Sequence, residues 1–338
     1  MSNDRPVASG VAGEEAIIQG FLAPLAVGFP GAFGLQDDCA LLTPEAGTEL
    51  VLKTDPVAEG VHFLPDDGPG DVAWKALAVN VSDLAAKGAI PIGYLMALSF
   101  PAPPTSQWLA AFAQGLAEAQ QKFGCHLIGG DTDRRPGPIT VSITVVGSVP
   151  TGSMVRRNTA RAGDAVFVSG TLGDASLGLL LRRNPRLAAT WGLAAAEGEH
   201  LRRRYVRPEP RLGLGDALRR NSASAMDISD GLAKDLTRMC NASGCGAQVR
   251  LADLPLSSAA AKALSADAKL AMAIAAGGDD YEILACVASA KASDFVAAAR
   301  QAEVVMTRIG TLTRERAVIF EGTDGLAASF PASGWDHF

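Results

Sequence analysis

The stretch that most constrains the fold is WKALAVNVSDLAAKGAIP, residues 74–91, because its spacing and its stop signals define one helix. At ~3.6 residues per turn its apolar side chains fall on one side, while Asp83 lies on the other side with Asn80 and Lys87. Gly88 suits a left-handed C-cap, and a proline three residues later blocks continuation. The sequence therefore predicts a helix that ends at this glycine.

Asp83 stands on that helix among small and apolar neighbours rather than among long charged residues. Taken alone, such a carboxylate is more often stray surface charge than a ligand, because motif-like spacings give many false matches. It gains weight only when the other acids of the chain are considered.

The remaining helix and strand signals alternate, which predicts an α/β (α+β) fold. With 338 residues the chain is long enough for two domains, and the turn at 150–153 divides it into 1–149 and 150–338. Pro56 is expected to end pairing of the first strand. The predicted elements are a helix at 14–25, strands at 50–53 and 93–100, a helix at 106–123, a short strand that ends in 129–131, strands at 139–149 and 165–169, a helix from Asp174, and an alanine-rich helix at 259–276.

Composition excludes several classes of protein. A net charge of -6, with no block of Lys and Arg, argues against a nucleic-acid binder, and the basic run at 202–207 is expected on a solvated helix. Five cysteines without zinc spacing fit a reducing compartment, with Cys240 and Cys245 as packing residues. No apolar run reaches the ~18 residues of a membrane span, and no signal peptide is evident, so the expected location is the cytoplasm.

Acidic residues follow predicted strands or tight turns at six places, and glycines adjoin five of them. Strand ends beside glycine are where α/β proteins bind ligands. Converging carboxylates would raise one another's pKa, and magnesium, a hard ion that accepts oxygen ligands and bridges to phosphates, relieves that repulsion. The six places are Asp37 with Asp38, Asp55, Asp83, Asp131, Asp227 with Asp230, and Asp279 with Asp280.

Taken together the acids predict a magnesium–nucleotide site, although each alone is more often a turn or cap residue, and Asp230 could cap the next helix. No Walker A sequence is present, so the metal ions would hold the phosphates. The glycine turn at 170–173 before Asp174 is a second, weaker phosphate signal, because any α/β unit begins in this way.

Seven stretches of the sequence carry a resemblance to a known family: DDCALL, KTDPVAEGVHF, WKALAVNVSDLAAKGAIP, LIGGDT, DISDGL, GGDDYEIL and GWDHF. In these stretches the chain resembles the thiamine-monophosphate kinase family of the aminoimidazole-ribonucleotide-synthetase-like superfamily. The matching stretches span nearly the whole sequence and together are highly specific. The resemblance implies phosphorylation of thiamine monophosphate to thiamine diphosphate by ATP, with several Mg2+ ions. It also implies a homodimer formed by a sheet-containing N-terminal domain, with a C-terminal α/β domain completing the site.

By position, the resemblance also assigns roles to individual residues. Nucleotide contacts would come from Gly130, Asp131, Arg157 and Ser229. The acceptor would meet His62, Asp279 and Trp335. The metal ligands would be Asp38, Thr54, Asp55, Asp83, Asp131, Asp227 and Asp230.

The chain departs from the family pattern at four positions. Gln36 replaces a glycine, and Lys53 stands where a serine is common. Asp279 shortens a glutamate, and Ala332 takes the place of an aromatic residue, for which Trp335 is the expected substitute.

The chemistry is consistent without the family. The second pKa of a phosphate monoester is near ~6, so at neutral pH the acceptor oxygen is already a nucleophile and no side chain is needed as a base. We therefore expect direct in-line transfer by positioning and charge neutralisation, with no catalytic residue in the strict sense. Each contact also has a structural reading: His62 as a packed residue that bonds a backbone group, Arg157 as part of a solvated turn, and Trp335 as an anchor.

Two alternatives remain open. One is another ATP-using enzyme of the superfamily, such as selenophosphate synthetase or a purine-pathway synthetase, although residues 1–20 lack the reactive cysteine that selenophosphate synthesis would use. The other is a non-catalytic nucleotide- or magnesium-binding protein, which would bind ATP without turnover.

Overall fold

The computed structural model describes residues 13–322 and 327–328, which form two compact units. The first unit groups the chain up to residue 46 with 52–80 and 91–148, and the second groups 47–51, 81–90 and the chain from 149 onward. The domain limits 1–149 and 150–338 stay a proposal. Among the described residues, no helix combines the length and apolar character needed to cross a bilayer.

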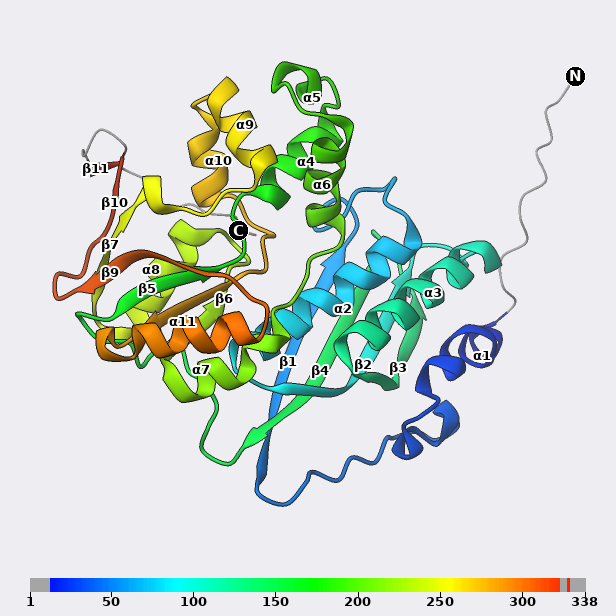
Figure 1. Ribbon diagram of the computed structural model, residues 1–338. Coiled ribbons are helices and arrows are strands. Elements are labelled where there is room, and N and C mark those ends of the chain that lie inside the picture. Colours follow the sequence, from blue (N-terminus) through cyan, green and yellow to red (C-terminus); the bar gives the residue numbers. More distant parts are fainter. Residues whose placement is uncertain (1–12, 323–326, 329–338) are drawn as a thin grey trace, which may run out of the picture. The chain divides into compact units, whose positions relative to one another are not determined.

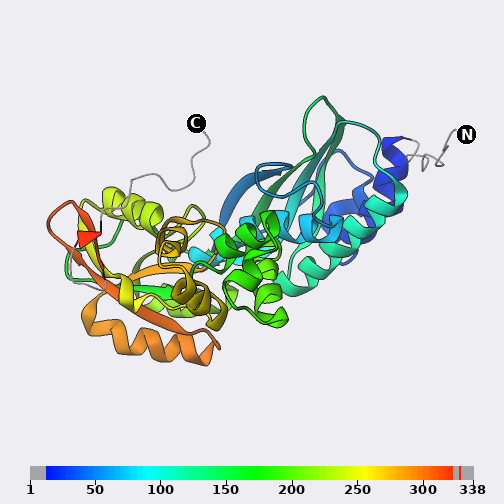
Figure 2. The same cartoon turned by 90° about the horizontal axis from the view of Figure 1, so that it is seen from above.

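The first unit is built on a four-stranded sheet with the order β1-β4-β2-β3. Helices α2 and α3 run along one face of it (Figure 1, Figure 2). Short α, π and 3-10 turns at Glu14–Ile17 (α1), Ile18–Leu22 and Ala23–Ala26 replace the single helix predicted at 14–25, and a further 3-10 segment is Pro30–Leu35. The other elements are β1 Thr48–Ala58, α2 Pro69–Ala86, β2 Ile90–Phe100, α3 Ser106–Phe123, β3 His126–Arg134 and β4 Thr140–Pro150.

Local capping explains why the two long helices stop where they do. Gly88 has φ 69°, and its N–H donates to the carbonyl of Ala85 at 3.0 Å, as the sequence predicts for the end of α2. In α3 the hydroxyl of Thr105 accepts the N–H of Trp108, and Gly124 closes the helix at φ 71°. The predicted boundaries of α3, 106–123, are therefore confirmed.

The prediction that Pro56 ends the first strand is wrong, because β1 continues to Ala58. The reason is topological: β1 lies at the edge of its sheet. A proline is tolerated there because its missing N–H need not face a neighbouring strand.

The second unit is built on a mixed seven-stranded sheet with the order β11-β10-β7-β9-β5-β8-β6. β10 pairs with β7 in parallel, and the other neighbouring pairs are antiparallel. The strands are β5 Ala165–Ser169, β6 Ser222–Asp227, β7 Gly246–Arg250, β8 Ile283–Val287, β9 Met306–Thr313, β10 Val318–Glu321 and β11 Ala327–Ala328. The helices are α4 Asp174–Arg183, α5 Leu187–Thr190, α6 Ala195–Val206, α7 Gly215–Asn221, α8 Leu232–Ser243, α9 Ser258–Ala266, α10 Leu270–Ala276 and α11 Ala292–Gln301.

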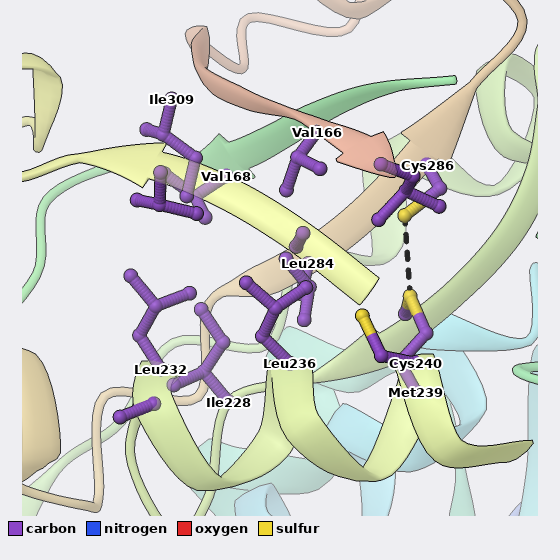
Figure 3. Close-up of a cluster of buried hydrophobic side chains, with 14 of the residues drawn as sticks. Val166, Val168, Ile228, Leu232, Leu236, Met239, Cys240, Leu284, Cys286 and Ile309 are labelled. Atoms are coloured by element: carbon purple, nitrogen blue, oxygen red, sulfur yellow. Dashed lines mark hydrogen bonds between the residues drawn. The ribbon is translucent and has the colours of Figure 1, made fainter. Parts of the chain in front are cut away.

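Both faces of this sheet are buried, and successive side chains of β5 pack alternately against helices on one face and on the other. Val166 and Val168 of β5 pack toward α8, whereas Phe167 packs toward α7 and α11, where it meets Phe295 edge-to-face at 5.6 Å. Figure 3 shows the α8 side, where the thiol of Cys286 approaches the sulfur of Met239 at 3.3 Å. The result is a sheet between two helical layers.

The alanine-rich run at 259–276 forms two helices rather than the one predicted. The break falls at Asp267, which leaves the helical conformation at φ -143° and ψ 99°. Its carboxylate accepts the N–H of Lys269 at 3.0 Å, and this local bond competes with the helical one.

Candidate functional site

Two predicted metal ligands, Asp83 and Asp227, lie close enough in the second unit to affect each other electrostatically. Asp227 ends β6 and is only 4% exposed. Burial, and then the charge of Asp83, raise the pKa of Asp227 well above its ordinary value, against smaller opposing effects of Ser82 and Lys87. The ammonium of Lys87 is bonded to the carbonyl of Ala225 at 2.8 Å. The pair therefore forms an electrostatically costly acidic site that a bound cation would stabilise.

The turn after β6 is held by a residue that sequence reasoning missed. Asp235, fully buried in the first turn of α8, accepts the backbone N–H groups of Ser229 at 3.0 Å and Asp230 at 2.9 Å through Oδ2. Burial raises the pKa of Asp235 to about 6. An acid in the first helical turn was the available signal. Asp230 does not cap α8, because the cap position is Gly231.

Asp230 has basic partners within the chain. Its carboxylate is ion-paired with Arg238 and lies 3.5 Å from the ammonium of Lys234. Both cations come from α8, one and two turns into the helix. A metal ion at Asp230 would therefore compete with charges that the chain itself supplies.

The GGDDYE segment runs beside the Ser229 turn. The N–H of Asp279 donates to the carbonyl of Ser229 at 2.9 Å, and the N–H of Tyr281 donates to the carbonyl of Ile228 at 2.9 Å. Asp279 and Tyr281 both have positive φ, 70° and 50°, and the Tyr281 hydroxyl reaches Oδ1 of Asp279 at 3.3 Å. The structure thus places Asp279, which is predicted to contact thiamine monophosphate, next to Ser229, which is predicted to contact the nucleotide, and Asp230, which is predicted to bind a metal ion.

Asp280, the neighbour of Asp279, bonds the backbone at the start of a helix rather than facing a ligand. It is buried, and its carboxylate accepts the N–H groups of Gly173 at 2.9 Å and Ala175 at 3.4 Å at the start of α4. Burial raises its pKa to about 8. The glycine turn that could have held a phosphate is therefore occupied by the chain's own carboxyl group.

Glu282 lies at the centre of a buried ion network. Its carboxylate accepts from Arg204 at 2.9 Å, from Nε of Arg211 at 2.8 Å and from the Ser169 hydroxyl at 2.5 Å. Arg204 is only 7% exposed, so the prediction that the whole basic run at 202–207 is solvated is wrong. A side chain at Gly170 would meet Glu282, since its Cβ would stand 2.3 Å from the carboxylate.

In the first unit, Asp38, Gly130 and Asp131 line one cavity of about 720 Å³. Gly130 cannot be replaced without rearrangement, because a Cβ there would lie 1.9 Å from the carbonyl oxygen of Met96. Gln36 lines the same cavity. Acidic groups and a close approach of the backbone thus coincide in the middle of β3.

Thr54 and Asp55 lie on β1, where a second residue that sequence reasoning missed holds Asp55. The amide of Asn80 accepts the N–H of Asp55 at 2.8 Å and donates to its carbonyl at 3.2 Å. The Asp55 carboxylate pairs with Lys53 at 2.9 Å. The Thr54 hydroxyl donates to the carbonyl of Ile143 at 3.2 Å. Asn80 stands in the polar stripe of α2, which was the signal that could have revealed it.

His62 bonds a backbone group, as its structural reading predicts: Nδ1 accepts the N–H of Ala58 at 3.0 Å. Its carbonyl accepts the buried ammonium of Lys75 at 2.8 Å. Contact with an acceptor stays a prediction. Arg157 is exposed, and its carbonyl accepts the Ser243 hydroxyl at 3.1 Å. Trp335 and Ala332 lie outside the described residues.

The predicted site residues thus gather in three places within the two units. No cluster of three or more side chains of Asp, Glu, His or Cys suited to hold a metal ion occurs in the part of the chain that the structure describes. The cavity in the first unit has Asp38, Gly130 and Asp131, the β1 edge has Thr54 and Asp55, and the second unit has Asp83, Asp227, Ser229, Asp230 and Asp279.

Comparison with known proteins gives matches along most of the chain. Residues 36–149 match the family described as AIR synthase related protein, N-terminal domain, and residues 161–322 match the corresponding C-terminal domain. The thiamine-monophosphate kinase of Caulobacter vibrioides is 40% identical over 322 residues, which are 94% of this chain and 88% of that protein.

Two solved structures support the same grouping. The thiamine-monophosphate kinase from Stenotrophomonas maltophilia K279a has a TM-score of 0.76 at 38% identity and covers 87% of this chain and 91% of its own. A structure of AaThiL complexed with AMPPCP and TMP also has a TM-score of 0.76, at 30% identity, and covers 91% and 97%. The predicted two-domain fold of mixed helices and sheets is thereby confirmed.

Proposed function

The chain belongs to the thiamine-monophosphate kinase family, and from that membership we propose that it phosphorylates thiamine monophosphate to thiamine diphosphate with ATP as the phosphate donor. The observation that carries the proposal is the similarity, over 91% of this chain, to a relative that binds AMPPCP and TMP together. A donor analogue and an acceptor in one protein are what a direct phosphoryl transfer requires.

Magnesium is the cofactor that suits the acids. Asp83 and the buried Asp227 form an acidic pair, and the predicted ligands offer only carboxylate and hydroxyl oxygen, which hard divalent ions prefer. Magnesium usually takes one or two carboxylates and completes its shell with water and substrate phosphates, so small groups of acids are sufficient. The remaining ligands would be Asp38, Thr54, Asp55, Asp131 and Asp230. When bound, the ions would neutralise negative charge on the transferring phosphate.

The chain's own residues act by positioning. The acceptor phosphate is already ionised near neutral pH, so no side chain is assigned the role of base. Arg157 and the backbone at Gly130 and Ser229 would contact the triphosphate, while His62 and Asp279 would orient the acceptor. Because the N–H of Asp279 donates to the carbonyl of Ser229, the acceptor contact lies beside the donor contact, on an adjacent turn of the second unit. Transfer is direct, without a phosphoenzyme.

A homodimer would complete the site. Asp55 on β1 and Asp131 on β3 stand on opposite edges of the four-stranded sheet. Three strand spacings correspond to about 14 Å, so these two carboxylates of one copy do not share an ion. A second copy whose β3 approached β1 would bring them together, and the exposed Leu52 and Leu95 offer apolar surface for the pairing. Light scattering that gives the mass of a monomer at assay concentration would contradict the dimer.

The test of the function is a direct assay. Purified protein with ATP, Mg2+ and thiamine monophosphate should yield thiamine diphosphate and ADP in equal amounts, and a parallel reaction with thiamine tests the choice of acceptor. Labelled ATP alone should leave no label on the protein. Binding of ATP without turnover would instead favour the nucleotide-binding alternative, for which the Lys53–Asp55 ion pair at a predicted metal position is the specific observation.

A further inference from the structure

The turn that carries Asp279 is held in an uncommon backbone conformation. Asp279 and Tyr281 both lie in the left-handed region, with φ of 70° and 50°, on either side of Asp280. Residues other than glycine adopt this region only when their surroundings determine it, and such positions concentrate at functional sites. The question is therefore which contacts keep the turn in place.

Arg204 is the side chain that reaches the centre of the turn. It comes from α6, and its Nη2 donates both to the backbone carbonyl of Asp280 at 3.0 Å and to the carboxylate of Glu282 at 2.9 Å. Its Nη1 is buried and has no hydrogen-bond partner in the described structure. A buried ion network with an unsatisfied donor is a poor source of stability. We therefore expect that it fixes the geometry of the residues that it contacts.

Glu282 orients that guanidinium from the other side. Its buried carboxylate is fixed independently by Arg211, through Nε at 2.8 Å and Nη2 at 2.5 Å, and by the hydroxyl of Ser169 at 2.5 Å. Ser169 in turn accepts the N–H of Ile283 at 2.7 Å. Arg204 is therefore held by a charged hydrogen bond to a carboxylate that is itself fixed in place.

We propose that Arg204 is a positioning residue for the acceptor: held by Glu282, it fixes the 278–281 turn so that Asp279 faces thiamine monophosphate in a single orientation. This inference rests on the proposed function. It predicts that loss of Arg204 weakens use of the acceptor and leaves use of ATP nearly unchanged, because the guanidinium bonds the backbone of the acceptor turn itself.

The experiment compares Arg204→Met with Arg203→Met, the neighbouring and exposed arginine of the same helix. Loss of a charge-assisted hydrogen bond corresponds to roughly tenfold or more in an equilibrium constant. We expect KM for thiamine monophosphate to rise on the order of tenfold in Arg204→Met, with KM for ATP within about twofold of wild type. Arg203→Met should match wild type in both constants. Equal rises in both KM values, or no rise, would overturn the positioning role.

Two further measurements separate positioning from simple loss of stability. Hydrogen exchange should speed up in peptides covering 277–282 of Arg204→Met, because the bonded N–H groups of Asp279 and Tyr281 lie there, and unchanged exchange would overturn the proposal. Phe295→Leu, in the core on the α11 side, supplies a destabilised protein with an intact turn and should keep the wild-type KM for the acceptor. If it showed the same rise, the effect of Arg204 would be one of stability.

Arg204→Lys and Glu282→Gln keep most of the packing, and they replace Arg204→Met in the kinetic comparison if that variant does not fold. Both should raise KM for the acceptor in the same selective manner, and a wild-type KM in both would overturn the proposal. If the wild-type protein makes no thiamine diphosphate at all, the proposed function fails instead, so the two failures are distinguishable.

Discussion

Replacement of Asn80 by alanine tests whether the position of Asp55 depends on an amide clamp. Asn80 is fully buried and bonds both backbone groups of Asp55, at 2.8 Å and 3.2 Å. Its third bond, to the carbonyl of Ala76 at 3.0 Å, is to a helical acceptor and adds little. A buried backbone group left unsatisfied costs about 1–3 kcal/mol, and for the half-buried backbone of Asp55 we take about 1–2 kcal/mol per group. Two such groups predict a loss of about 2–4 kcal/mol in the free energy of unfolding, or a fall in Tm of roughly 3–6 °C for a chain of 338 residues.

The assay combines thermal unfolding with turnover. Because Asp55 would no longer be held in place, we also expect kcat/KM for thiamine monophosphate to fall on the order of a hundredfold. The matched control is Asn221→Ala, which removes only an amide bond to the carbonyl one helical turn earlier, at 3.0 Å. If Asn80→Ala melts and turns over like Asn221→Ala, Asn80 does not position Asp55 and the reasoning is refuted.

Three further predictions concern the acids and one glycine. Asp83→Asn and Asp131→Asn should each abolish thiamine diphosphate formation while circular dichroism stays that of wild type; near-normal activity in both would remove the metal assignment. The pKa of Asp280, raised to about 8, lies above its value in the unfolded chain, so the ionised form disfavours folding and stability falls as pH rises from about 4 to about 8. Asp280→Asn should reduce this decline by about 4 kcal/mol between pH 5 and 8 in urea titrations, at 1.4 kcal/mol per unit, and parallel curves for the two proteins would refute it. Gly130→Ala, whose Cβ would stand 1.9 Å from a carbonyl oxygen, should lose ATP binding in calorimetry, whereas Gly129→Ala, 3.0 Å from a movable leucine methyl, should retain most of it.

Elements whose ends carry local signals could be predicted closely from the sequence. The helix at 106–123, the strand at 165–169 and the start of α4 at Asp174 agree with the structure, because caps and turn glycines act within a few residues. Pro56 shows where this fails: whether a proline ends a strand depends on the strand's place in the sheet, which no local signal encodes.

The candidate site could be predicted only in part from the sequence. Its acids stand out as motifs, but the groups that hold them pair across long separations: Glu282 bonds Arg204 from 78 residues away and Ser169 from 113. A run of arginines cannot show which member is buried, and Arg204 therefore looked like its solvated neighbours. Burial is decided by packing between elements, and that information is spread over the whole chain.

The holding groups share a feature that bears on how the site works. Asn80 bonds the backbone of Asp55, Asp235 bonds the backbone of the Ser229 turn, and Arg204 bonds the backbone of Asp280. The chain thus fixes the acidic segments through their main chain. Lys53 and Arg238 pair with Asp55 and Asp230, whereas the repulsion between Asp83 and Asp227 is left to be balanced by what binds. Binding of a cation and a nucleotide then offsets an electrostatic cost that remains in the folded protein. Replacing a side chain that holds the backbone therefore changes the geometry of the site, whereas replacing an acid changes its charge. The two classes should separate in any assay that measures stability and turnover on the same variants.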